Sequence, residues 1–279
     1  IPDAHDRIAE YFKSRGRYKE AESLLNRLLA HRKGRFDHRT FDTMYSRAGV
    51  HYQQRRYQEA EALYLLGLAA EVKQHGADHL RTFATGNNLA LVYESKGRFD
   101  EAESLYARGL AGQEKHLGRD HRDTLTTVNN FANLRESQER YEEAEHLYLR
   151  ALAGNEKVGA DHTDTLMTVD HLGHLYTQLE RYEEADSFLL RALAGHEKKL
   201  EADHPSTLMT VNHIANLRYR QGRYREAEVL YKRALVGQVV TIGPDHPDTR
   251  VLRGNPDLAL IGQGKYEEVL RQPRNKSDL

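Results

Sequence analysis

The 279-residue chain carries 41 Lys and Arg against 42 Asp and Glu, a near balance that excludes a global attraction to nucleic acid or to an anionic membrane. It has no cysteine, which excludes disulfides and thiolate metal sites, and the absence fits a reducing, cytoplasmic location. No run of about 18 apolar residues occurs, so we expect no membrane-spanning segment. Because the chain begins at Ile1 and leads directly into a repeated pattern, we interpret it as a fragment of a longer protein.

A phrase that opens with an aromatic residue recurs along the chain. It reads GRYKEAESLL at residues 16–25 and GRFDEAESLYARGL at residues 97–110, and a worn copy, GKYEEVL, lies at residues 264–270. The aromatic residues are spaced by 39, 42, 42, 41, 42 and 42 residues and are Tyr18, Tyr57, Phe99, Tyr141, Tyr182, Tyr224 and Tyr266. A fixed period of this size predicts an array of stacked supersecondary units.

Each period divides into two helices, A and B; in the third period we expect helix A over residues 80–96 and helix B over residues 99–117. In the fourth helix B the apolar residues share one face. Neither helix buries its stripe alone, so the repeats must stack. We expect a single domain over residues 1–272 and a disordered tail over 273–279. The expected repeats are 3–36, 38–77, 79–119, 121–160, 162–202, 204–244 and a degenerate unit at 246–272.

The two kinds of link carry different signals. The B-to-A link contains an Asp-His pair, such as Asp78-His79, and reads as a helix start capped by the aspartate. The A-to-B turn carries a glycine such as Gly97, which suits a left-handed helix cap. Glu139 and Glu180 replace that glycine in two repeats, so we expect those turns to be less stable or differently shaped.

Two further features of the helices lead to expectations. Glycine recurs inside helix B as Gly112, Gly154, Gly195 and Gly237, although it is unfavourable there by about 1 kcal/mol. The recurrence predicts close backbone approach, so Gly154→Leu should destabilise the protein. Asn255-Pro256 lies where the last helix A should be continuous, which predicts a distorted final unit that is frayed beyond about Arg271.

The helix pair, with alanine and large aromatics at these offsets, resembles the tetratricopeptide repeat. The 42-residue period and the phrase TVNNFANL at residues 127–134 resemble the longer, kinesin-light-chain type. The resemblance implies an all-α, right-handed superhelical solenoid of helix-turn-helix repeats. The phrases GNEK and GHEK further resemble repeat arrays of fungal NACHT or NB-ARC signalling NTPases. The chain itself contains no Walker A motif.

In this repeat type helix A lines a concave groove, and the resemblance therefore implies a set of groove residues. Most of them lie in two columns, each of which is one position of helix A that recurs from repeat to repeat, and the two columns are one helical turn apart. Together the columns form a strip along the groove, and Arg220 lies near its end. The set is Asn87, Asn129, Asn133, Asp170, His174, Asn212, Asn216 and Arg220. Amide groups both donate and accept, so such a ladder would hold the main chain of an extended peptide. The alternative is that the asparagines support neighbouring helices; we expect exposed positions that tolerate replacement by alanine.

Chemistry of other kinds has little support. The Asp-His pairs form a row, one per repeat, and do not converge, so we expect no metal site. Asp170, His171 and His174 form a carboxylate and imidazole cluster without further ligands, so we expect no catalytic residues and no cofactor. The basic and aromatic run at residues 218–225 falls across a helix end, a turn and a helix start, which makes nucleic acid an unlikely partner.

We therefore expect a non-catalytic scaffold that binds a protein or an extended peptide. The alternative is an intramolecular sensor or autoinhibitory repeat region of a STAND-type signalling NTPase. We expect no enzyme activity and no membrane partner. The identity of the ligand, the parent protein and the oligomeric state stay open at this point.

Overall fold

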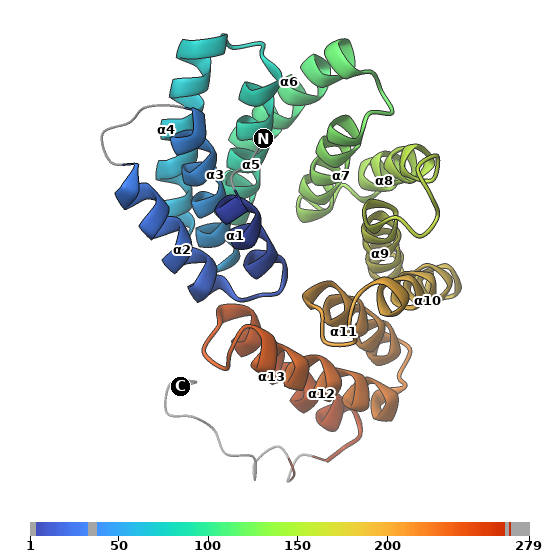
Figure 1. Ribbon diagram of the computed structural model, residues 1–279. Coiled ribbons are helices and arrows are strands. Elements are labelled where there is room, and N and C mark those ends of the chain that lie inside the picture. The colour runs from blue at the N-terminus through green and yellow to red at the C-terminus, as the bar shows by residue number, and fades with distance from the viewer. Residues whose placement is uncertain (1–3, 33–37, 266–267, 269–279) are drawn as a thin grey trace. The chain divides into compact units, whose positions relative to one another are not determined.

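The computed structural model describes residues 4–32, 38–265 and 268, and this part of the chain is all helix and contains no strand (Figure 1). The A helices, the first of each pair, are α1 Ala4–Ser14, α3 His38–Gln53, α5 Leu80–Ser95, α7 Arg122–Ser137, α9 Thr163–Gln178, α11 Pro205–Arg220 and α13 Pro247–Gly262. The B helices are α2 Tyr18–His31, α4 Tyr57–His75, α6 Phe99–Leu117, α8 Tyr141–Asn155, α10 Tyr182–Lys199 and α12 Tyr224–Thr241. The predicted pairing of helices is confirmed. The expected tail at 273–279 lies outside the described residues.

The chain divides into two compact units, Ile1–Leu172 and Gly173–Leu279, with the boundary inside α9. In the first unit α5 packs against α6 and α7 packs against α8, and α2, α4 and α6 each also contact the next A helix. In the second unit α11 packs against α12, and α12 against α13. The helix pairs therefore stack in sequence order within each unit, as a repeat array requires.

A small residue and a large residue on each B helix form the centre of every pair. The alanine of the recurring phrase is fully buried in all six B helices, as Ala21, Ala60, Ala102, Ala144, Ala185 and Ala227. One turn further along, Tyr106 and Tyr148 are also fully buried. The alanine lets the paired A helix approach closely, and the tyrosine fills the space beside it.

The links differ from expectation in which residue caps the helix. The N-cap of α5 is His79, whose Nδ1 accepts from the backbone N–H of Arg81 at 3.2 Å. His121, His204 and His246 cap α7, α11 and α13 in the same way. The aspartate lies one residue too early to reach the helix amides, so the expectation of an aspartate cap is wrong. The threonine that follows also stabilises the link, since Thr82 Oγ1 donates to the carbonyl of Gly76 at 2.8 Å.

The A-to-B turns have one conformation whatever residue occupies them. Gly97 and Gly222 have φ of 71° and 74°, as expected for left-handed caps. Arg55, Glu139 and Glu180 have φ of 56°, 59° and 60° at the same place. The glutamate turns are therefore not reshaped. They hold a non-glycine residue in a strained region, because packing on both sides fixes the turn.

The B-helix glycines meet side chains of the paired A helix. A Cβ added at Gly154 would lie 2.6 Å from Cδ1 of Leu125, and one at Gly237 would lie 2.5 Å from Cδ2 of Leu208. At Gly112 the ring of Phe83 would be even closer. The expected close approach is confirmed at Gly112, Gly154 and Gly237, but a large side chain and not a backbone lies over each of these three glycines.

The final A helix is not broken. Helix α13 runs from Pro247 to Gly262 with Pro256 inside it, and Leu252, Pro256 and Leu260 are buried. The expectation of a distorted unit is wrong for this helix, because packing of its apolar face against α12 offsets the hydrogen bond that the proline removes.

Candidate functional site

The first column of predicted groove residues in the first unit lies inside the protein. Asn129 is 1% exposed, and its Nδ2 donates to Thr168 Oγ1 at 2.8 Å, a bond from α7 to α9. Asn87 and Asp170 are buried as well. The expectation of exposure is therefore wrong for these three residues. Asn129 therefore connects two adjacent repeats, as expected if the asparagines support neighbouring helices.

The second column stabilises the B-helix tyrosines. Asn133 accepts a hydrogen bond from the hydroxyl of Tyr148 in the first unit. In the second unit Asn216 accepts one from the hydroxyl of Tyr231 at 2.7 Å. Both asparagines keep partly exposed side chains. In each asparagine the amide oxygen holds the tyrosine, and the amide N–H₂ group takes no part in that bond.

One turn further along the A helices of the first unit lie two carboxylates. Glu94 Oε1 accepts from Ser137 Oγ at 3.2 Å, and its Oε2 accepts from the Tyr106 hydroxyl at 3.3 Å. Burial raises the pKa of Glu94 to about 7, and the neighbouring Glu136 adds to this rise. Glu136 itself accepts from the Tyr148 hydroxyl at 2.9 Å. These acids are partly buried and are oriented by the tyrosine hydroxyls.

The second unit presents a row of polar groups on its A helices. On α9, Nε2 of His174 and Nε2 of Gln178 lie 3.2 Å apart. Arg220 Nη2 on α11 donates to Gln178 Oε1 at 2.8 Å. The rings of His174 and His213 have centroids 4.6 Å apart. Asn212 accepts from Asn255 of α13 at 3.1 Å. The structure thus brings His174, Asn212, Asn216 and Arg220 onto neighbouring helices of one unit.

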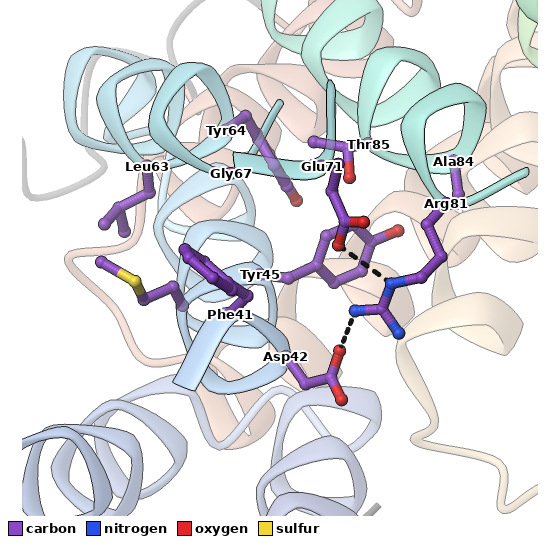
Figure 2. A pocket seen from close by; sticks show the side chains of 11 residues that line it. Phe41, Asp42, Tyr45, Leu63, Tyr64, Gly67, Glu71, Arg81, Ala84 and Thr85 are labelled. Carbon is purple, nitrogen blue, oxygen red and sulfur yellow. Dashed lines mark hydrogen bonds and ion pairs between the residues drawn. The ribbon is translucent and has the colours of Figure 1, made fainter. Parts of the chain in front are cut away.

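A separate cavity of about 210 Å³ lies among α3, α4 and α5 in the first unit (Figure 2). Its apolar wall contains Phe41, Met44, Tyr45, Leu63 and Tyr64. The rings of Tyr45 and Tyr64 meet edge to face, with centroids 5.6 Å apart. Asp42, Gly67, Glu71, Arg81, Ala84 and Thr85 complete the lining.

Charged groups form one side of this cavity. Arg81 Nε donates to Glu71 Oε1 at 2.9 Å, and its Nη2 donates to Asp42 Oδ1 at 2.5 Å (Figure 2). Glu71 is 6% exposed, and its Oε2 has no hydrogen-bond partner within the described residues. Nε2 of His75 lies 3.6 Å from Oε2. A buried carboxylate oxygen in this state favours a donor.

The repeat register explains why the cavity exists. Phe41 corresponds to Phe83 one period later, but Ala70 stands where Gly112 receives the Phe83 ring. The methyl group of Ala70 excludes that arrangement, and Phe41 lines the cavity instead. Gly67, like Gly109 one period later, carries no side chain and leaves further space. One small departure from the repeat pattern, Ala70 in place of a glycine, thus helps to open the cavity.

Metal ligands do not gather in the described parts of the chain. Across residues 4–32, 38–265 and 268 no three His, Asp or Glu side chains are placed to hold a metal ion. In the same residues no helix is long and apolar enough to cross a membrane.

The helix pairs, the buried alanine and the capped links are the features of one repeat family. The family model of the tetratricopeptide repeat matches residues 39–115, 81–157, 123–198 and 163–236, which together make up more than half of the chain. The chain belongs to the tetratricopeptide-repeat family. No curated protein matches it.

Solved structures with the same fold include proteins of several kinds. A putative kinesin light chain from Podosopora anserina with nearly identical repeats is 25% identical; the match covers 71% of this chain and 95% of that one, with a TM-score of 0.54. The B. thuringiensis quorum sensor NprR, in complex with its cognate peptide NprX, is 17% identical; the match covers 100% of this chain and 76% of that one, with a TM-score of 0.69.

A third solved structure belongs to a signalling ATPase. The STAND protein with a tetratricopeptide repeat sensor from Pyrococcus horikoshii is 14% identical; the match covers 95% of this chain and 39% of that one, with a TM-score of 0.66. This tetratricopeptide chain therefore spans well under half of that protein. At 17% and 14% identity the likeness shows the fold alone.

Sequence reasoning missed the cavity among α3, α4 and α5. Its signal was present, because aligning the repeats column by column shows Tyr45 at the position of Asn87 and Glu71 at the position of Gln113. Both departures fall in one repeat and one interface. The predicted groove residues begin one repeat later, at Asn87.

Proposed function

We propose that this tetratricopeptide array binds a protein segment or an extended peptide and performs no chemistry of its own. The observation that carries the proposal is the row of partly exposed polar groups on the A helices of the second unit. Arg220 and Gln178 join α11 to α9, and Asn212 and Asn255 join α11 to α13. The side chains of each pair are hydrogen-bonded to each other, and a bound peptide main chain would supply donors and acceptors that take the place of these bonds.

The chemistry of the row suits an extended segment. Amide side chains supply donors and acceptors for peptide N–H and C=O groups without regard to sequence, and Arg220 supplies a cation for an acidic residue. The likeness to NprR, whose structure holds its peptide NprX, supports a peptide as the class of ligand.

A peptide array tests the proposal. We would probe the full chain with an array of extended peptides and measure the affinity of the strongest hit by calorimetry. His174→Ala and Arg220→Ala should each weaken binding by roughly 3- to 10-fold, the loss expected for one hydrogen bond. Lys232→Ala, on the exposed side of α12, is the matched control. An array without hits, or a hit that binds both variants as tightly as the parent chain, contradicts the proposal.

A second candidate is the sensor region of a STAND-type signalling NTPase. The observation that favours it is the fold likeness to the Pyrococcus horikoshii STAND protein over 95% of this chain. The GNEK phrase does not add to it, because Asn155 is buried and donates to Thr168 of the next repeat at 3.1 Å, a structural role. The test is ATP hydrolysis by the parent protein with and without these repeats; equal rates in both forms argue against a sensor.

A further inference from the structure

We propose that the cavity among α3, α4 and α5 binds the side chain of one lysine from a partner peptide. This inference deepens the proposed function, on which it rests for the peptide, but the cavity is tested by itself below. Its volume of about 210 Å³ is below the range of sites for drug-sized ligands and suits a single side chain.

The first step in the argument is the unsatisfied oxygen. Glu71 Oε2 is buried and has no hydrogen-bond partner within the described residues, while Oε1 is already occupied by Arg81. This oxygen is covered in the structure, so an occupant reaches it only when the carboxylate of Glu71 turns toward the cavity; a charged donor then makes the stronger bond. An aliphatic or acidic occupant leaves the oxygen unsatisfied.

The second step is the local charge. Asp42 and Glu71 outnumber Arg81 in the lining, which leaves one negative charge unbalanced when the imidazole of His75, 3.6 Å from Glu71 Oε2, is neutral. Burial raises the pKa of Tyr45, and the negative charges of Glu10 and Asp123 add to this rise. Glu10 is itself paired with Lys13. The field at the cavity therefore favours a cation.

The third step separates lysine from arginine. The wall of Phe41, Tyr45, Tyr64, Met44 and Leu63 is apolar along most of its length. A lysine places four methylene groups against such a wall and ends in a compact ammonium group, which also interacts favourably with ring faces. A guanidinium prefers two parallel acceptor atoms, whereas Arg81 already holds Oε1 of Glu71. The geometry therefore matches lysine better.

A methyl-labelled spectrum tests the cavity directly. The chain has three methionines, and only Met44 lines the cavity, so Met167 and Met209 serve as internal controls. We would label the methionine methyl groups with ¹³C and titrate the full chain with Nα-acetyl-lysine methylamide. The Met44 signal should shift and saturate at the millimolar concentrations expected of so small a ligand, while Met167 and Met209 stay unchanged. The norleucine analogue, which lacks the ammonium group, should bind at least about tenfold more weakly.

Two variants and one control test the residues. Glu71→Gln should weaken the lysine derivative about tenfold, since it removes the charged acceptor. It should fold, because glutamine occupies the equivalent positions as Gln113 and Gln238. Tyr45→Asn installs the residue of the next repeat and should also weaken binding. Glu59→Gln removes an exposed acid from the same helix, away from the cavity, and should leave the affinity unchanged.

The outcomes separate this inference from the proposed function. Equal binding of lysine and norleucine derivatives, tighter binding of Nα-acetyl-tryptophanamide, or no selective shift of Met44 overturns the lysine site. Such a result leaves the A-helix row of the second unit untouched, because none of its residues lines the cavity. Conversely, a saturable Met44 response with an empty peptide array supports the cavity and overturns the proposed scaffold function.

Discussion

Replacing two glycines of B helices by alanine should change stability in opposite directions. Gly67 in α4 and Gly154 in α8 are both interior helical residues, so alanine gains about 1 kcal/mol of helix propensity at each. They differ in what the new methyl group meets. At Gly67 the nearest atom is Thr85 Cγ2 at 3.8 Å, an ordinary contact. At Gly154 it is Leu125 Cδ1 at 2.6 Å.

The overlap at Gly154 decides the sign there. Carbon atoms in contact prefer about 3.5–4.0 Å, so Leu125 must move by about 1 Å. Leu125 is 1% exposed and has no free space to enter. Overpacking of this kind destabilises by about 1–3 kcal/mol, which exceeds the gain in helix propensity. We expect Gly154→Ala to lose about 1 kcal/mol and Gly67→Ala to gain about 0.5–1 kcal/mol.

Urea denaturation followed by far-UV circular dichroism measures both changes. A double-mutant cycle identifies the cause, because in a Leu125→Ala background the methyl group at residue 154 finds free space. Gly154→Ala should then become stabilising by about 1 kcal/mol, a reversal of sign. If Gly154→Ala stabilises the protein equally in both backgrounds, the reasoning about close approach is refuted.

Three further predictions concern single residues. Ala144→Leu should destabilise the protein by about 1–3 kcal/mol, seen as a lower Tm, because Ala144 is fully buried between α7 and α8. Glu139→Gly should raise the free energy of unfolding by about 1 kcal/mol in urea, because φ is 59° there. Burial raises the pKa of Glu94 from 4.5 to about 7, so the folded protein holds this proton more tightly than the unfolded chain, and stability falls as pH rises through that window. Glu94→Gln should therefore gain up to about 3 kcal/mol at pH near 8 and much less near pH 5, whereas the exposed Glu101→Gln should show no such trend in Tm.

The fold was predictable because the repeat period, the buried alanine and the aromatic position recur with little change. The pattern of one copy, such as residues 99–117, is compatible with a helix in many different folds. Six copies in register leave few folds other than a repeat array. The B-helix glycines were informative for the same reason. What period alone did not reveal was the atom that meets each glycine, since Phe83 and Leu125 belong to the partner helix and only the packing places them there.

The candidate site was harder to predict because the position of a residue along helix A does not determine whether its side chain is buried. Asn129 and Asn212 occupy equivalent positions, yet Asn129 is buried against Thr168 while Asn212 is partly exposed and meets Asn255. The difference depends on the following repeat, which supplies a threonine in one case and Leu252 in the other. A prediction made from one repeat's column omits this neighbour, and so treated both asparagines alike.

The interface between the second and third repeats departs from the repeat pattern at Tyr45 and Glu71. Glu71 occupies the position that is Gln113 or Asn155 in the next two repeats. Tyr45 occupies the position that is Asn87 or Asn129 there. Each change alone would be unfavourable inside a stack, since Glu71 is a buried charge and Tyr45 remains exposed beside Tyr64. Arg81 offsets the first by holding one oxygen of Glu71, and leaves the other oxygen unsatisfied. A cationic side chain in the cavity would offset the remaining charge of Glu71, which is why we propose this interface as a site of recognition.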